Sequence, residues 1–345
     1  MKESETKANQ TDTHNTHTMP LWASENRSAT GPISFSAAVV GGDSRQVALA
    51  KYLSSHGCRV TLVGLGNVGI LPDGMSISPS LTRAVEQAGV TRIILPLPTT
   101  RDGNTVWCPL DLDHSLSLDE VAAVLSPHMR LYGGRLPAAF LATLRSRGLF
   151  ATDYYEDETL QIQNAQITAE GAVMTAMELT DYTIHGARMA VVGYGRIGQL
   201  LARMLLALGA DVTVFARRSD ALAWAEADGC RTAPLPASES DVRPERTASL
   251  RALCDGFDVI FNTVPARILG RDSWRIMTRK TLWVELASSP GGVDPEAARQ
   301  ASEQNGLRVV WAPSLPGRYA PVTAGEHIAR LILSHSGNDE GRKDA

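Results

Sequence analysis

The chain has few cysteines and few aromatic residues, and it has no long uncharged apolar run. Its 345 residues include four cysteines, Cys58, Cys108, Cys230 and Cys254, and none of them stands in a C-x-x-C pair. Zinc ribbons and dithiol redox centres need such pairs, so the sequence predicts neither, and we expect no metal site. No apolar stretch reaches the roughly 18 to 20 residues of a membrane helix, and the N-terminus has no apolar signal core. We therefore expect a cytoplasmic protein.

An excess of positive charge is also missing. Lys and Arg number 33 against 37 Asp and Glu, which gives a formal net charge of −4. Proteins that bind nucleic acids usually carry a basic patch, so this balance favours small-molecule chemistry and argues against nucleic-acid or membrane partners. The length and the hydrophobic content of 43% allow two domains, each with its own core.

The most informative segment that is present is a glycine turn between a strand and a helix. Residues 189–198 read MAVVGYGRIG, in which the glycines have the spacing G-x-G-x-x-G. A predicted helix, Gln199–Leu208, and a second predicted strand, Asp211–Phe215, complete a βαβ unit. In this context the turn binds a dinucleotide, with the pyrophosphate at the helix N-terminus. The predicted contacts are Gly193, Gly195, Arg196, Ile197 and Gly198.

The residues after the second strand indicate which dinucleotide is bound. An NAD site usually has Asp or Glu at this point to bind the ribose 2′-hydroxyl, whereas this chain has Ala216, Arg217, Arg218 and Ser219. Guanidinium groups and a hydroxyl suit a 2′-phosphate, because arginine binds phosphate oxygens through paired charged hydrogen bonds. The sequence therefore favours NADP over NAD, with Arg217, Arg218 and Ser219 as its contacts.

Alternating strands and helices predict an α/β protein with two doubly wound domains, the first flavodoxin-like and the second Rossmann-like. A helix around Thr168–Thr183 should join them, and a C-terminal helix, Thr323–Ile332, should return to the first domain after a loop at Pro313–Pro321. A second glycine match at Gly64–Gly69 runs into a loop signal and should not bind phosphate. Strands are expected near residues 37–40, 59–63, 92–95, 130–133, 189–192, 211–215, 259–262, 281–285 and 308–311.

Composition divides the rest of the chain. Residues 1–36 are polar and without periodicity, which is typical of a disordered tail, and the Pro- and Ser-rich stretch 234–246 is expected to be a surface insertion. The expected parts are a tail (1–36), an N-terminal substrate domain (37–165), an NADP-binding Rossmann domain (166–312), a closing loop with the return helix (313–335) and a second disordered tail (336–345).

Five motifs in order resemble those of the family of dipicolinate synthase A subunits, which occur in endospore-forming bacteria, over roughly residues 37–335. Ser289 stands where members of that family often have arginine, so Arg318 is expected to supply the charge instead. The motifs are Gly41–Gln46 (GGDSRQ), Asp181–Gly186 (DYTIHG), Asn262–Pro265 (NTVP), Leu286–Gly292 (LASSPGG) and Leu315–Gly325 (LPGRYAPVTAG).

The resemblance implies a reaction. A dihydrodipicolinate-type intermediate of the lysine pathway would be oxidised to dipicolinate, pyridine-2,6-dicarboxylate, with NADP as hydride acceptor. It also implies a role in sporulation, a location in the mother cell, a small dicarboxylate as substrate, and the B subunit of dipicolinate synthase as partner. A homo-oligomer remains open.

Such an enzyme needs a proton acceptor and donors for two carboxylates. His185 is the first candidate acceptor because imidazole titrates near neutral pH, although a histidine after a helix also caps carbonyl groups. Asp181 and Glu170 are the alternatives. The candidate carboxylate donors, chosen because they lie in turns after strands, are Arg45, Thr99, Thr100, Arg101, Arg135 and Arg318.

The nicotinamide side of the site should be formed by residues at two further strand ends, Thr263, Pro265, Ala287 and Ser288. Two rival functions stay open. A D-2-hydroxyacid dehydrogenase would need a catalytic set of Arg, Glu and His, for which only His327 lies near the expected region. An NADP-sensing module without catalysis would keep the glycine turn and lack a second set of polar groups.

Overall fold

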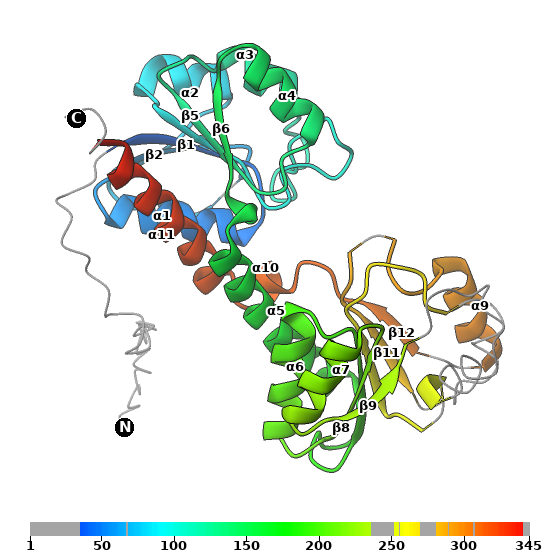
Figure 1. The fold of residues 1–345 in the computed structure, drawn as a ribbon. Helices are drawn as coiled ribbons and strands as arrows, with labels where there is room; N and C mark the ends of the chain where they lie inside the picture. The colour runs from blue at the N-terminus through cyan, green and yellow to red at the C-terminus, as the bar shows by residue number, and fades with distance from the viewer. Residues whose placement is uncertain are drawn as a thin grey trace, which may run out of the picture. The chain divides into compact units, whose positions relative to one another are not determined.

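Two parallel β-sheets with flanking helices make up the fold (Figure 1). The computed structural model describes residues 35–66, 68–235, 252–254, 256–269, 281–288, 290–305 and 308–340. Residues 1–34 of the expected tail, residues 236–246 of the expected insertion, and Ser289 lie outside this range. Phe35 and Ser36, which the sequence assigned to the tail, are buried at 7% and 4% exposure, so ordered structure begins earlier than predicted.

The first sheet has the strand order β3-β2-β1-β4-β5-β6. Without its short edge strand β3, this is the flavodoxin-like order that the sequence predicted. Both β3 and β6 were missed, because strands of three and four residues carry too little periodicity to be recognised. The strands are β1 (Ser36–Val40), β2 (Arg59–Val63), β3 (Met75–Ile77), β4 (Arg92–Ile94), β5 (Arg130–Gly133) and β6 (Phe150–Asp153).

Capping side chains begin three of the four helices α1 to α4. Asp43 accepts from the backbone N–H of Arg45 at the start of α1, and Ser117 and Glu120 form a reciprocal capping box at the start of α3. The loop from Gly64 to β3 contains no helix among its described residues, so the second glycine match presents no helix terminus, as predicted. The helices are α1 (Ser44–Ser55), α2 (Leu81–Ala88), α3 (Leu118–Val124) and α4 (Ala138–Ser146).

The second sheet has the order β12-β11-β10-β7-β8-β9, which is the six-stranded Rossmann arrangement. All five strands predicted here are present, and β9 is an additional edge strand. The elements are β7 (Arg188–Val192), α6 (Arg196–Ala207), β8 (Asp211–Ala216), α7 (Ser219–Ala227), β9 (Arg231–Pro234), β10 (Val259–Asn262), β11 (Leu282–Glu285), α9 (Pro295–Asn305) and β12 (Arg308–Trp311).

The connecting helix α5 (Glu158–Leu179) is longer than predicted and begins ten residues earlier, with Asp157 as its N-cap. It packs against α6 and against a short helix, α10 (Leu315–Tyr319), which lies where the sequence predicted only a loop. A Cβ on Gly171 would meet Leu315 and Tyr319 at 3.0 Å, so α5 and α10 are in close contact. A 3₁₀ turn, η2 (Tyr154–Glu156), precedes α5.

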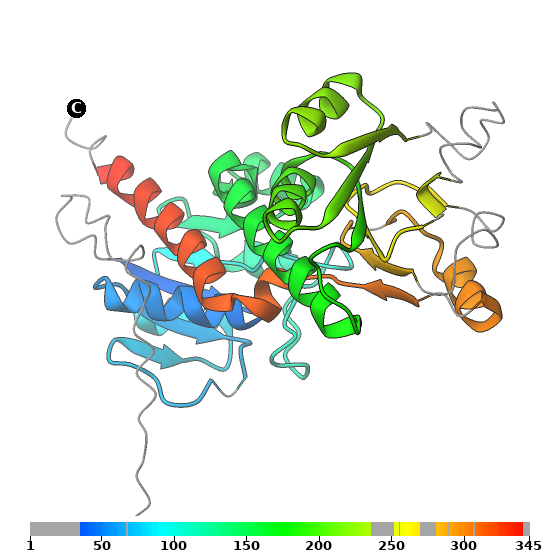
Figure 2. The ribbon, with the colours of Figure 1, turned by 90° about the horizontal axis from the view of Figure 1, so that it is seen from below.

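The last helix, α11 (Pro321–Glu340), packs along α1 (Figure 2). Its return to the first sheet was predicted, but its length was not, because it continues into the segment 336–345 that was expected to be disordered. Ser336 is fully buried, donates to Ile332 O, and accepts from Arg92 Nε. Of the described helices, none combines the length and the apolar character that a bilayer crossing requires.

Candidate dinucleotide and substrate sites

The three glycines of the turn after β7 have three different surroundings. Gly193 has a φ of +94°, and a Cβ on it would lie 2.4 Å from Thr263 Oγ1. A Cβ on Gly198 would lie 2.2 Å from Gly193 O, so this glycine lets α6 pack against the turn. Gly195 is the N-cap of α6 and has no atom within 4 Å of where its Cβ would be. The turn is therefore open at the point where a pyrophosphate approaches.

A pocket of about 440 Å³ adjoins this turn and carries positive charge. Arg196, Arg217 and Arg218 line it together with the N-terminus of α6, which favours anions, and Arg196 donates to both carboxylate oxygens of Glu158 in the same lining. Ile197, the second residue of α6, is partly buried and is not among the pocket residues. These surroundings fit the phosphates of a dinucleotide. The lining residues are Glu158, Gly193–Arg196, Gln199, Ala216–Arg218, Ala221, Leu235 and Val264.

The two arginines after β8 differ in their partners. Arg218 donates to both carboxylate oxygens of Asp220, with Nε to Oδ1 at 2.9 Å. The second of the two arginines is therefore already paired with a carboxylate. The pKa of Asp220 is lowered by the hydrogen bond from Arg218. Arg217 is exposed, lines the pocket, and has no ion pair within the described part of the chain. Ser219 opens α7 and is exposed.

The predicted nicotinamide-side residues lie at the carboxyl ends of β10 and β11, as expected. Thr263 donates through Oγ1 to Val192 O at 2.8 Å, which ties the loop after β10 to the glycine turn. Pro265 and Ser288 are exposed, and Ala287 donates its N–H to Glu285 Oε1 at 3.2 Å.

Sequence reasoning missed Glu285, the last residue of β11. Its carboxylate is 1% exposed and accepts hydrogen bonds from four groups. Burial raises its pKa, and the donors act in the opposite direction. The signal available in the sequence was a single glutamate at the end of the otherwise apolar strand segment LWVE. The donors are Asn262 Nδ2 at 2.6 Å, Gly292 N at 3.1 Å, Trp283 Nε1 at 3.2 Å and Ala287 N at 3.2 Å.

The structure separates His185 and Asp181 from the glycine turn. Both precede β7, and Gly186 donates its N–H to Gly209 O just before β8, so this segment lies at the amino edge of the second sheet. The five residues of β7, about 16 Å of strand, stand between it and Gly193. These two candidate proton acceptors therefore lie at the far end of β7 from the glycine turn, because a helix that precedes a parallel strand ends at the amino edge of the sheet. Glu170 is exposed on α5 and accepts from Gln166.

Three predicted carboxylate donors are exposed arginines, each stacked on an aromatic ring. Arg101 lies 4.3 Å above Trp107, Arg135 lies 5.1 Å above Tyr155, and Arg318 lies 5.0 Å from its neighbour Tyr319. None of the three has an ion pair among the residues that the structure describes. The stacking holds each guanidinium in place while its hydrogen-bond donors stay available.

Arg135 has a strained backbone, with a φ of +56°. Asp153 holds this conformation by accepting from the N–H groups of Arg135 at 3.0 Å and Leu136 at 2.7 Å. Non-glycine residues with positive φ cluster at functional sites. Tyr155, under the Arg135 guanidinium, lies three residues before Glu158, which accepts two hydrogen bonds from Arg196 at the glycine turn. Arg135 therefore lies close to the dinucleotide pocket.

The other three predicted donors form hydrogen bonds within the protein. Arg45 is 5% exposed and binds Asp43 through two hydrogen bonds of 2.8 Å and Leu97 O at 2.6 Å. Thr99 is fully buried and donates to Pro96 O. Thr100 donates to Asp102, whose pKa is lowered chiefly by backbone N–H groups of its own loop. These residues shape the carboxyl edge of the first sheet.

Helix α10 connects this edge to Arg318. A Cβ on Gly317 would lie 2.2 Å from Asp43 Oδ2 and 3.0 Å from Arg45 Nε, so α10 packs against the buried Asp43–Arg45 pair. Arg318 is therefore next to the carboxyl edge from which Arg101 and Arg135 project. These three arginines, which the sequence analysis named as candidate carboxylate donors, therefore lie around the carboxyl edge of the first sheet.

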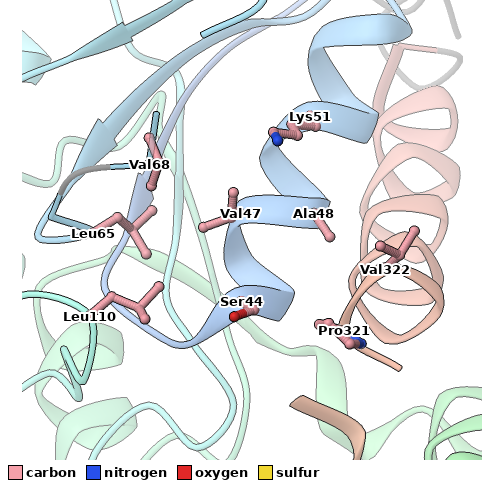
Figure 3. Close-up of a pocket in the computed structure, with 9 residues that line it drawn as sticks. All are labelled: Ser44, Val47, Ala48, Lys51, Leu65, Val68, Leu110, Pro321 and Val322. Carbon is pink, nitrogen blue, oxygen red and sulfur yellow. The ribbon is translucent and has the colours of Figure 1, made fainter. Parts of the chain in front are cut away.

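Two further features contain none of the predicted site residues. A pocket of about 420 Å³ lies between α1, α11 and the loops at Leu65 and Leu110, and its lining is mostly apolar, with Ser44 and Lys51 as the polar exceptions (Figure 3). The four cysteines are buried, and burial raises the pKa of Cys108 and Cys230 to about 11. Within the described residues no three His, Cys, Asp or Glu side chains gather as metal ligands.

The fold and the glycine turn define the class of the protein, a dehydrogenase-type oxidoreductase with a nicotinamide dinucleotide-binding domain. Residues 158–267 match the family described as D-isomer specific 2-hydroxyacid dehydrogenase, NAD binding domain. Residues 36–155 match the family described as the N-terminal domain of the dipicolinate synthase A subunit.

The chain belongs to the family of dipicolinate synthase A subunits. It is 34% identical to the dipicolinate synthase A subunit of Bacillus subtilis over 303 residues, which cover 86% of this chain and 93% of the relative. Two solved structures are similar. The dipicolinate synthase A subunit of Bacillus halodurans has a TM-score of 0.72 at 28% identity over 88% of this chain and 97% of its own. The corresponding structure of the B. subtilis enzyme has a TM-score of 0.71 at 29% identity over 89% and 97%.

Proposed function

We propose that this chain is the dehydrogenase subunit of a dipicolinate synthase and oxidises a dihydrodipicolinate-type ring to dipicolinate with NADP. The observation that carries the proposal is that Arg135, strained and without an ion pair among the described residues, stacks on Tyr155, and that Glu158, three residues further on, binds Arg196 at the open glycine turn. A donor for a substrate carboxylate thus lies beside a site for a dinucleotide. A sensing module would have no need for this second group.

NADP is proposed over NAD because of Arg217. This guanidinium lines the pocket at the end of β8, where the adenosine ribose lies in such folds. Arg218 is paired with Asp220, so we expect it to contribute less than Arg217 to binding of the 2′-phosphate. This ion pair is exposed and weak, so the phosphate can compete with Asp220 for the arginine.

The substrate class follows from the three stacked arginines. A ring with two carboxylates needs two positively charged groups, and arginine binds a carboxylate through two parallel hydrogen bonds. We propose that Arg135 and Arg318 bind the two carboxylates and that Arg101 closes the site, since it follows β4 in the loop that Asp102 orders through three hydrogen bonds from Thr100, Asn104 and Thr105.

The oxidation removes a hydride and a proton from the ring, and the ring becomes aromatic. NADP, when bound, accepts the hydride. Of the three predicted proton acceptors we retain Glu170, because His185 and Asp181 lie at the amino edge of the second sheet, away from the glycine turn. The chain's own residues orient the ring and neutralise the charge of its carboxylates, so that the ring carbon that loses the hydride is held against the coenzyme.

A partner is part of this proposal. The relatives are named as A subunits, and we propose that a second protein, the B subunit by family resemblance, acts with this chain in the mother cell of a sporulating bacterium.

The test is to incubate the purified chain with freshly generated dihydrodipicolinate and NADP, and to follow NADPH formation and the ultraviolet absorbance of a pyridine dicarboxylate. We expect both signals, and we expect Arg135→Ala to raise KM at least tenfold, as loss of a charged hydrogen-bond pair does, with NADP affinity kept. Arg145→Ala, an exposed arginine on α4, is the matched control. Turnover of simple 2-hydroxy acids alone would instead support a D-2-hydroxyacid dehydrogenase. NADP binding without any turnover, in the presence or absence of the partner protein, would support a sensing module.

A further inference from the structure

The buried Glu285 has a geometry that the proposed function does not use. Each of its four partners is a donor, namely the side-chain N–H groups of Asn262 and Trp283 and the backbone N–H groups of Ala287 and Gly292. A protonated carboxyl would need an acceptor for its own O–H, and these contacts offer none. The arrangement therefore fits an ionised carboxylate, kept charged in a buried site by four hydrogen bonds.

These hydrogen bonds join the loops after β10 and β11 at the carboxyl edge of the second sheet. Asn262 and Glu285 are paired in register at the ends of β10 and β11. Asn262 also donates to Val264 O at 3.0 Å and accepts from Val264 N at 3.1 Å, which shapes the loop after β10. The side chains of Thr263 and Val264 approach Gly193, where a Cβ would lie 2.4 Å and 2.8 Å from them.

The loop after β11 is held just as closely. Ala287 and Gly292, at its two ends, both donate to Glu285, and a Cβ on Gly292 would lie 2.4 Å from Asn262 Nδ2. One side chain thus positions the loops after β10 and β11 and, through Asn262, supports the glycine turn after β7.

The direction of a bound dinucleotide gives this charge a role. In a doubly wound sheet the two halves of the dinucleotide lie on either side of the strand that carries the glycine turn. Arg217 marks the adenosine half at the end of β8, so the nicotinamide half extends towards β10 and β11. The nicotinamide ring is cationic when oxidised and neutral when reduced, so a nearby buried anion favours the oxidised form.

We infer that Glu285 is a positioning residue for the nicotinamide, which orders the two loops around the ring and whose negative charge makes the site prefer the oxidised coenzyme. This inference rests on the proposed function. It gives the reaction a direction at the level of binding, because the protein would collect the hydride acceptor and release the reduced product.

The test compares dissociation constants for NADP⁺ and NADPH in the wild-type chain, Glu285→Gln and Glu285→Asp, measured by calorimetry. We expect Glu285→Gln to shift the ratio of the two constants about tenfold towards NADPH, the effect of one charge at roughly 10 Å in a medium of dielectric constant about 20. Glu285→Asp keeps the charge and shortens the side chain, so it should weaken both complexes and keep the ratio. Glu303→Gln, which removes an exposed charge on α9, is the matched control and should change neither value.

An unchanged ratio in Glu285→Gln would overturn the inference, because a purely structural role weakens both complexes equally. If the Gln variant does not fold, Glu285→Asp decides. This variant retains the charge, so a changed ratio of the NADP⁺ and NADPH dissociation constants in it would also overturn the inference. Failure of the wild-type chain to bind either dinucleotide would be distinguishable, because it would refute the proposed function itself.

Discussion

At the scale of single residues, local chemistry explains which side chains remain available for ligands. Arg45, Thr99 and Arg218 satisfy their donors within the protein, whereas Arg217 and Arg135 have no ion pair among the described residues. A charged group that already has a partner must lose it before it binds a ligand, so the unpaired arginines bind at a lower cost.

Arg217 and Arg218 can be separated by substitution. We expect Arg217→Ala to weaken NADP binding roughly 10- to 100-fold, since a hydrogen bond to a charged group is worth about 1.5–3 kcal/mol, and to leave NAD binding nearly unchanged. Arg218→Ala, whose arginine is held by Asp220, should weaken NADP binding less. Dissociation constants for both dinucleotides check this. Equal losses for NAD and NADP in Arg217→Ala would contradict a 2′-phosphate contact.

At the scale of elements, the helices α10 and α11 connect the end of the chain to α1 through glycines. A Cβ on Gly325 would lie 2.4 Å from Arg45 O and 2.8 Å from both Ala48 Cβ and Leu49 N. Because most of these atoms are backbone or belong to a small side chain, the helices cannot approach this closely with a larger residue at this position.

Gly325→Ala should therefore lower the free energy of unfolding by about 1–3 kcal/mol, even though alanine favours a helix over glycine by about 1 kcal/mol. Urea denaturation measures this change. Ser334→Ala, an exposed position on the same helix, is the control and should stay within about 0.5 kcal/mol of the wild type. A Gly325→Ala variant that is as stable as the wild type would mean that α11 packs less closely on α1.

At the scale of the whole molecule, stability couples to pH through His327 in the middle of α11. Burial lowers its pKa from 6.5, and Arg330 on the next turn acts in the same direction. Since the unfolded chain binds this proton more readily than the folded chain, the contribution of His327 to stability is present above pH 6.5 and is lost as the pH falls through the lowered folded pKa.

Thermal unfolding should show this loss as the pH falls from about 7.5 through 6.5 and on towards the lowered folded pKa of His327. In His327→Gln, which does not titrate, we expect Tm to fall less over the same range than in the wild-type chain. The comparison isolates one group, because the other titrating residues are common to both proteins. Parallel pH profiles for the two proteins would show that the His327 pKa is the same in the folded and unfolded chains.

Much of the fold and of the dinucleotide site could be predicted from sequence, because both depend on short-range patterns. The buried strands and the glycine spacing encode the two sheets and the turn at Gly193. Among the elements that were missed, β3, β6, β9 and α10 have three to five residues each, too few for a period to appear.

The sequence by itself determined the two parallel sheets, the dinucleotide turn and the family, since apolar periodicity, glycine spacing and motif order are properties of neighbouring residues. Only the tertiary structure decided the chemistry around them. It placed His185 at the amino edge of the second sheet, paired Arg45 with Asp43 and Arg218 with Asp220, and arranged four hydrogen-bond donors around Glu285. The physical reason is that the availability of a charged group depends on its neighbours in space, and those come from strands and loops distant in the chain.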